Sequence, residues 1–97
     1  MKAITRNAIR AFNQSKPFNQ GNTCVSVGIT GNVYLSLHGN QIAVKTKEGK
    51  LKITNAGWFT NTTKERLNGL DCVSISQRKG IWYLNGEVWN GEFTEVK

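Results

Sequence analysis

The stretch 55–69, NAGWFTNTTKERLNG, divides a run of strand-like sequence from a final group of short strands. Within it, Thr62 and Glu65 have the spacing of a capping box, in which each side chain accepts a hydrogen bond from the other residue's backbone amide. Asn68-Gly69 is a typical helix end, because glycine adopts the left-handed conformation without a Cβ clash. The stretch therefore predicts a helix of about two turns, which needs tertiary packing because isolated helices of that length are unstable.

The packing of this short helix is expected to come from its apolar residues. Trp58, Phe59 and Leu67 are predicted to hold the helix against a sheet, with the Trp58 ring in the core. Lys64 and Arg66 are then predicted to point away from that contact.

The N-terminal segment has the pattern of an amphipathic helix over residues 3–14. Its apolar residues recur at helical spacing, and its cations lie one helical turn apart on the opposite face. The apolar face is Ile4, Ala8, Ala11 and Phe12, and the charged face is Lys2, Arg6 and Arg10. Pro17 disfavours helical geometry at the residue before it, so the helix is expected to end there or earlier.

Four short strands are predicted between the two helices, over residues 23–27, 33–38, 41–47 and 50–54. Two-residue turns at Gly39-Asn40 and Glu48-Gly49 would set their register, and a slip of one residue would reverse the two faces. The predicted buried face is Leu35, Leu37, Ile42, Val44 and Ile53, and the predicted outer face is Tyr34, Lys45, Lys47, Lys50 and Lys52. Lysines placed opposite one another repel, so this face needs either full solvation or an anionic partner.

The segment after the short helix is predicted to form two or three more strands, over residues 71–76, 81–84 and 87–89. A basic turn covers residues 77–80, and Asn85-Gly86 is a strong signal for a tight hairpin. Trp82 then lies opposite Trp89, where burial is favoured because tryptophan contributes a large apolar area.

These elements predict a single α+β domain, and a chain of 97 residues is long enough for one domain. The expected fold is an N-terminal helix, an antiparallel meander of about six to seven short strands, and one short helix between strands four and five. The expected divisions are 1–20 for the N-terminal helix and loop, 21–54 for the four-strand meander, 55–70 for the loop and short helix, and 71–97 for the C-terminal strands.

The chain is strongly basic, with 13 Lys and Arg against 6 Asp and Glu and a net charge of +7. A domain this basic favours an anionic partner, and nucleic acid is the first candidate. The cations are expected to neutralise phosphates, and Tyr34 is expected to stack on a base or sugar. The expected nucleic-acid-binding residues are Tyr34, Lys45, Lys47, Lys50, Lys52, Arg78, Lys79, Arg6 and Arg10.

The sequence carries few groups suited to catalysis or metal binding. His38 is the only histidine, Asp71 is the only aspartate, and Cys24 and Cys72 lack metal-ligand spacing. We therefore expect no enzyme activity, no metal and no cofactor. Both cysteines lie in strand-like sequence and are expected to be buried free thiols of a cytoplasmic protein, since no apolar run is long enough to span a bilayer.

Three motifs stand out along residues 21–92: LHGNxIA from Leu37, GWxTxTTxxRLN from Gly57, and WYLNG from Trp82. With these motifs the chain resembles a family of small uncharacterised proteins encoded by tailed bacteriophages and related mobile elements. The central motif is the specific one, and its residues are Gly57, Trp58, Thr60, Thr62, Thr63, Arg66 and Asn68. The resemblance implies an accessory protein in the cytoplasm of an infected bacterium and supplies no catalytic residue.

The leading functional hypothesis is a non-enzymatic phage accessory protein that binds DNA or RNA through the lysine-rich sheet face. One alternative is a protein–protein inhibitor of a host or defence factor, in which the basic surface meets an acidic partner. Another is an oligomeric structural protein that uses the aromatic C-terminal hairpin. The lysine face is also compatible with a solvated sheet face or a protected sheet edge.

Overall fold

Residues 1–96, the part of the chain that the structure describes, form two helices and nine short strands in this computed structural model. The helices are α1 (Ala3–Asn13) and α2 (Asn61–Leu67). The larger antiparallel sheet has the order β1 (Phe18–Gln20), β2 (Thr23–Val27), β3 (Val33–Leu37), β4 (Asn40–Lys45), β5 (Leu51–Ile53) and β9 (Thr94–Val96). The smaller sheet has the order β6 (Ile75–Arg78), β7 (Ile81–Leu84) and β8 (Glu87–Val88). Lys97, the last residue of the predicted C-terminal segment, lies outside the described residues.

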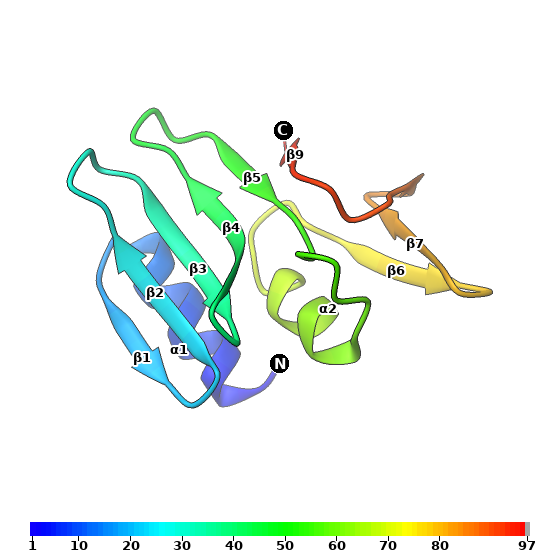
Figure 1. The fold of residues 1–97 in the computed structure, drawn as a ribbon, viewed down its shortest axis with the longest axis horizontal. Coiled ribbons are helices and arrows are strands. Elements are labelled where there is room, and N and C mark those ends of the chain that lie inside the picture. The colour runs from blue at the N-terminus through cyan, green and yellow to red at the C-terminus, as the bar shows by residue number, and fades with distance from the viewer. Residues whose placement is uncertain (97) are drawn as a thin grey trace.

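The α+β class, the N-terminal helix and the mainly antiparallel strands are confirmed. Two strands, β1 and β9, go beyond the prediction. Both are short, and β9 pairs with β5, which is distant in sequence, so no local pattern marks it. In Figure 1, α1 lies behind β2 and β3, and α2 lies between β4 and β6. The short helix therefore joins the larger sheet to the smaller one.

The segment after α2 departs from its prediction at its first strand. Residues 71–74 are not part of a strand: Asp71 and Cys72 form a turn, in which Cys72 has a φ of +64°, in the left-handed region. The strand β6 begins at Ile75 and continues through Arg78, so the turn before β7 is Lys79-Gly80 alone. The expected pair of buried thiols is also wrong, since Cys24 is half-buried and Cys72 is exposed; both are free.

The C-terminal hairpin forms as predicted, and its tryptophan pair is buried. The Trp89 amide donates a hydrogen bond to the Trp82 carbonyl at 2.9 Å, and the two ring centroids lie 6.3 Å apart. Both rings belong to the core, whereas Ile81 and Val88 on the other face of the hairpin are exposed. The tryptophans therefore stabilise the fold and are unavailable to a partner.

A β-bulge between β3 and β4 decides which side chains face the core. Leu35 pairs with Ala43 but Ser36 pairs with Gln41, so Ile42 is an extra residue on β4. Ile42 and Ala43 are both buried. The two-residue turn before β4 is His38-Gly39 and not the predicted Gly39-Asn40, since Leu37 pairs with Asn40. That change moves the pairing by two residues and keeps the faces, whereas the one extra residue of the bulge moves the rest of β4 to the opposite face, because side chains alternate with a period of two.

The predicted faces of β4 are therefore wrong. Val44 lies opposite Tyr34 and Lys52 and is only partly buried, whereas Lys45 lies opposite Val33 on the inner face. The predicted pairing of Lys45 with Lys52 fails for a separate reason: the turn between β4 and β5 has three residues, 47–49, in place of the predicted two-residue turn Glu48-Gly49, so Lys45 pairs with Leu51. The continuous lysine face is lost. The buried residues of this prediction that the structure confirms are Leu35, Leu37, Ile42 and Ile53.

Lys45 instead closes the C-terminal end of α1. Its Nζ donates hydrogen bonds to the carbonyl oxygens of Phe12 and Asn13, at 2.9 and 3.1 Å, and lies 5.6 Å from the centroid of the Phe12 ring. A cation at this end of a helix satisfies carbonyls that have no partner within the helix and offsets the partial negative charge of the macrodipole. This lysine therefore has a structural role.

The helix α1 packs much as its pattern predicts. Ala8 and Phe12 are buried and Ile4 and Ala11 are partly buried, while Thr5 and Ile9 complete the inner face. Its cations Lys2, Arg6 and Arg10 are exposed, as expected.

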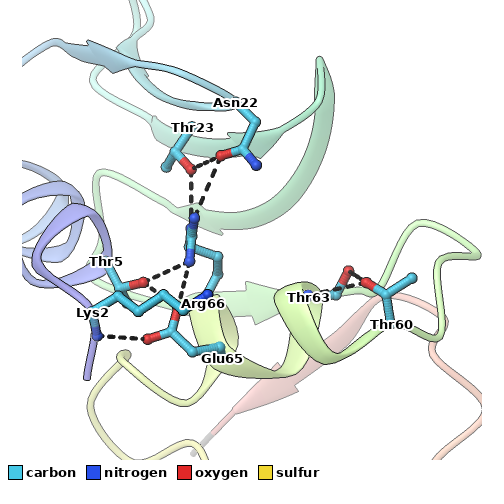
Figure 2. A network of polar contacts seen from close by, with 8 residues as sticks. All are labelled: Lys2, Thr5, Asn22, Thr23, Thr60, Thr63, Glu65 and Arg66. Carbon is cyan, nitrogen blue, oxygen red and sulfur yellow. Dashed lines mark hydrogen bonds and ion pairs between the residues drawn. The ribbon is translucent and has the colours of Figure 1, made fainter.

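Arg66 is the polar centre of the core. Its side chain is 4% exposed, so the prediction that it points away from the packed face is wrong. Figure 2 shows its guanidinium group extending from α2 toward α1 and β2. Nε donates to Oγ1 of Thr23 at 3.0 Å, Nη1 donates to Oγ1 of Thr5 at 2.8 Å, and Nη1 also pairs with the carboxylate of Glu65. The network ties three elements that are distant in sequence.

Glu65 completes this network and does not form the predicted capping box. One carboxylate oxygen accepts hydrogen bonds from Thr5 and Arg66, and the other accepts the backbone amide of Lys2 at 3.1 Å. Burial by itself raises the pKa of Glu65, but the hydrogen bonds from Thr5 and Lys2, together with Arg66, bring the pKa below its ordinary value. The folded state therefore favours the charged carboxylate.

We expect Arg66→Ala to lower the free energy of unfolding by about 3 kcal/mol, because it leaves buried polar groups without their partner. The control is Arg6→Ala, which removes an exposed cation from α1 and is expected to change the same quantity by at most about 0.5 kcal/mol. Urea unfolding followed by circular dichroism measures both. Equal losses in the two variants would contradict the role given to Arg66.

The lowered pKa of Glu65 predicts a pH-dependent contribution to stability. The charged carboxylate stabilises the fold above the ordinary pKa of 4.5, and this contribution is lost as the pH falls through the lower pKa of the folded state. The difference in melting temperature between the unmodified protein and Glu65→Gln should therefore be largest near neutral pH and shrink on acidification. Glu92→Gln, the same chemical change at an exposed position, controls for the loss of one negative charge.

Candidate functional site

The loop 56–60, between β5 and α2, exposes its two aromatic residues, and we refer to it as the aromatic loop. Trp58 is 56% exposed and Phe59 is 54% exposed. The prediction that Trp58 lies in the core is therefore wrong, because α2 is held in place by Leu67 and Arg66, both fully or almost fully buried. Phe59 still contacts the core through the edge of its ring, with its centroid 5.2 Å from that of Trp82.

A set of local hydrogen bonds fixes the start of the aromatic loop. Oδ1 of Asn55 accepts the Gly57 amide at 2.8 Å, and the Asn55 carbonyl accepts the Trp58 amide at 2.9 Å. Gly57 has a φ of +84°, a conformation that glycine adopts without strain. The Asn55 amide in turn donates to the Gly91 carbonyl at 2.9 Å, which anchors the loop to the C-terminal segment. The indole of Trp58 is thus presented by a constrained backbone.

Gly91 also leaves room for the Asn55 side chain. A Cβ added at Gly91 would lie 2.3 Å from the Asn55 amide group. The side chain of Asn55 is therefore enclosed on one side by the C-terminal segment and on the other by the aromatic loop, and it is 1% exposed.

The helix α2 begins two residues earlier in its motif than the sequence predicts. Thr60 is the N-cap, and its Oγ1 accepts the Thr63 amide at 3.2 Å; Figure 2 shows the two threonines together at the start of the helix. The predicted cap, Thr62, lies inside the helix and is half-buried. The capping box fails because Glu65 is held by Thr5 and Lys2.

A cavity of about 200 Å³ opens beside the indole of Trp58, and we call it the Trp58 cavity. Leu37 and Ile42 supply apolar lining from β3 and the bulge of β4, and Trp58 supplies an aromatic wall. The polar lining comes from the turn after β3, the aromatic loop and the first turn of α2. The full lining is Leu37, His38, Ile42, Asn55, Trp58, Thr60, Thr62 and Thr63.

The remaining residues of the GWxTxTTxxRLN motif have structural roles. Thr63 is buried, Arg66 forms the network described above, and the side chain of Asn68 bonds both the amide and the carbonyl of Ile75, at 2.6 and 3.1 Å. Trp58 and Thr62 are left as motif residues that meet at the Trp58 cavity. The motif therefore contains both residues that stabilise the fold and residues that line the Trp58 cavity.

Sequence reasoning did not place His38 or Asn55 in this site. A local signal exists for Asn55, because an asparagine two residues before a glycine favours a turn in which its side chain bonds the glycine amide. No local signal exists for His38, which reaches the site through the turn between β3 and β4.

The residues predicted to bind nucleic acid lie on several different surfaces. Arg6 and Arg10 are on α1, Lys47 and Lys50 are exposed at the turn after β4, and Lys45 caps α1. Tyr34 and Lys52 are on the outer face of the larger sheet, where Glu95 lies opposite Lys52. Lys79 is exposed at the turn after β6, and Arg78 lies over the Tyr83 ring at 5.5 Å.

Comparison with known protein families assigns the chain to one of them. The chain matches the Kyanoviridae Gp96 protein family over residues 1–96. The chain belongs to this family. It is a family of phage proteins, so the phage origin implied by the motifs is confirmed. No curated protein and no solved structure matches the chain.

Two further features of this member of the Kyanoviridae Gp96 family concern metal binding and membrane spanning. Within residues 1–96, no group of three or more His, Cys, Asp and Glu side chains is arranged to hold a metal ion. Neither helix of that part of the chain has the length and apolar character needed to cross a membrane.

The observed cap predicts a clear order of effects for two neighbouring threonines. Thr60→Ala should lower the free energy of unfolding by about 1 kcal/mol, because the Thr63 amide loses its acceptor. Thr62→Ala should cost less than about 0.5 kcal/mol, since its side chain has no capping role. Chemical unfolding of both variants checks the order, and a larger loss for Thr62→Ala would contradict the observed cap.

Proposed function

We propose that this protein is a non-enzymatic phage accessory protein that binds an acidic host protein through the aromatic loop, with Trp58 as the anchor. The observation that carries the proposal is the indole of Trp58, more than half exposed and held by a constrained backbone at the edge of a cavity. Tryptophan is among the residues that most often dominate binding energy at protein interfaces.

The cost of exposing this residue favours a binding role. Trp58 and Phe59 are adjacent and both more than half exposed, which leaves a large apolar area in water. Arg66 and Leu67 are the buried residues that hold α2 in the core, whereas Trp58 is more than half exposed. Because the loop backbone is already ordered, binding would lose little conformational entropy at this position.

The charge of the protein favours an acidic partner. The net charge is +7, and opposite charge on the partner would accelerate association and discourage basic competitors. Cations that have no structural role in the described region, such as Arg6, Arg10 and Lys50, are exposed and contribute to this field.

Nucleic acid binding is the second candidate, supported by the cations of α1. Arg6 and Arg10 are exposed and one helical turn apart, about 6 Å along the axis. They replace the lysine sheet face as the basis of this candidate, because Lys45 caps α1 and Lys52 faces Glu95. A contact of this kind would be salt-sensitive and independent of Trp58.

A capture experiment with matched variants tests the proposal. The tagged full-length protein is incubated with nuclease-treated lysate of the host bacterium, and retained proteins are identified after a high-salt wash. Trp58→Ala should weaken the affinity for a specifically retained partner by about 30-fold or more, the loss that corresponds to a hot-spot residue of about 2 kcal/mol. The melting temperature of this variant should stay close to that of the unmodified protein, because the ring is exposed.

The control is Phe93→Ala, which removes an aromatic ring of similar exposure, 55%, outside the aromatic loop. It should retain the partner at full affinity. Equal retention by Trp58→Ala would overturn the proposal. Capture seen only in a parallel lysate without nuclease, and lost by the double variant Arg6→Gln, Arg10→Gln, would instead favour nucleic acid.

A further inference from the structure

An open groove of about 460 Å³ lies along one side of α1, and we call it the α1 groove. Arg6, Ile9, Arg10 and Asn13 line it from the helix, and their spacing of three or four residues places them on one side of α1. Gly69, which follows α2, also belongs to the lining. The groove is therefore found where α1 meets the end of α2.

Close packing between the two helices fixes the position of this groove. A Cβ added at Gly69 would lie 2.9 Å from side-chain carbons of both Thr5 and Ile9, so α1 approaches this glycine directly. The Lys2 amide donates to the Glu65 carboxylate of α2 at 3.1 Å, and Figure 2 shows the two residues side by side. The exposed side of α1 is thus presented by a helix that is held on its buried side.

The cations of the α1 groove have no carboxylate partner. Arg6 and Arg10 are exposed, and the only ion pair among residues 1–96 belongs to the Arg66 network. No acidic residue of that part of the chain lines the groove, and residues 1–47 contain none. Like charges one helical turn apart repel, so an anionic occupant relieves a repulsion as well as adding an attraction.

The lining fits an acidic polypeptide better than a nucleic-acid backbone. Met1, which is 71% exposed, and Ile9 give the groove apolar lining beside its two arginines. A polypeptide can place apolar side chains between acidic ones, whereas a nucleic-acid strand carries a phosphate at every nucleotide and favours a longer run of cations. Each guanidinium group can hold one carboxylate through two parallel hydrogen bonds.

We propose that the α1 groove binds an acidic segment of the same protein partner that Trp58 anchors. Carboxylates of the segment pair with Arg6 and Arg10, and an apolar side chain between them lies against Met1 and Ile9. This inference rests on the proposed function for its partner, and it adds an electrostatic contact to the apolar one at the aromatic loop.

One partner can reach both contacts. The aromatic loop ends at Thr60, the N-cap of α2, and Gly69 lies just beyond the other end of that helix. The rise of a helix separates these two residues by about 14 Å. A standard protein interface covers about 800 Å² on each partner, which is roughly 30 Å across. The aromatic loop and the α1 groove are therefore close enough for a single partner surface.

The double variant Arg6→Gln, Arg10→Gln tests this contact in the complex. The partner that the full-length protein captures from nuclease-treated lysate is purified, and its affinity for each variant is measured at low salt. The double variant should bind about tenfold more weakly, because two charge pairs are lost. The difference should shrink at about 1 M salt, where charges are screened beyond about 3 Å. The melting temperature should stay close to that of the unmodified protein, because both side chains are exposed.

The matched control is the double variant Lys16→Gln, Lys79→Gln. It removes the same charge from exposed positions outside the α1 groove. It should weaken binding by less than about twofold, through the long-range field alone. Equal losses in the two double variants would mean that the partner responds to overall charge and would overturn the inference.

A titration without the partner distinguishes carboxylates from phosphates. Hexaglutamate added at low salt to the full-length, ¹⁵N-labelled protein should shift the side-chain Nε–H resonances of Arg6 and Arg10 and leave the indole resonance of Trp58 in place. Single-stranded hexathymidylate, a probe of similar charge, should bind more weakly at the same resonances. Absence of the hexaglutamate shifts at about 10 mM, or tighter binding of hexathymidylate, would contradict the inference.

The two proposals fail in different ways. If Trp58→Ala loses the partner but the arginine double variant keeps it at full affinity, the proposed function stands and the α1 groove inference is overturned. If Trp58→Ala keeps the partner but the arginine double variant loses it, the groove inference is supported and Trp58 is not the anchor. If both variants keep the partner, both proposals fail.

Discussion

The structure depends on one buried guanidinium group. Arg66 donates to Thr5 on α1 and Thr23 on β2 and pairs with Glu65 beside it on α2. The helix that carries it has 7 residues, too few to be stable alone. Asn22 is a further, longer contact of the same group, at 3.4 Å. A single charged side chain thus orients a short helix against two elements, and burial of that charge is tolerated because each of its nitrogens has a partner.

The position of α2 determines the candidate site. Thr60 begins the helix, so the aromatic loop has only a few residues in which to pass from β5 to that cap. The hydrogen bonds of Asn55 fix the start of that passage, and Thr60 fixes its end. Trp58 lies between these two fixed points, so the backbone that carries its exposed ring is held at both ends. Ile42 reaches the same cavity because of the bulge in β4.

The distribution of cations changes how the net charge of the protein is interpreted. Composition counts every lysine and arginine equally, but here Arg66 is buried, Lys45 caps α1 and Lys64 contacts Gln77 and Trp82. These cations stabilise the fold and contribute little to recognition. The exposed cations still favour an anionic partner, yet they are dispersed, whereas the aromatic loop concentrates two exposed rings at one place. This distribution supports the proposed contact with an acidic protein surface over the alternative contact with a phosphate backbone.

Local patterns by themselves determined the order of the elements other than β1 and β9, the amphipathic helix α1, the Asn85-Gly86 hairpin with its tryptophan pair, and the burial of Leu67. Each of these follows from residues close together in the chain, where spacing and turn chemistry act directly. Tertiary structure alone decided that Arg66 is buried, since its partners Thr5 and Thr23 are 61 and 43 residues away. It also decided the faces of β4, because one bulged residue reverses an alternation that the sequence presents as regular. The exposure of Trp58 was likewise decided by the tertiary structure: a large apolar ring is normally a core residue, but here Leu67 and Arg66 are the buried residues of the region and the Trp58 ring is more than half exposed.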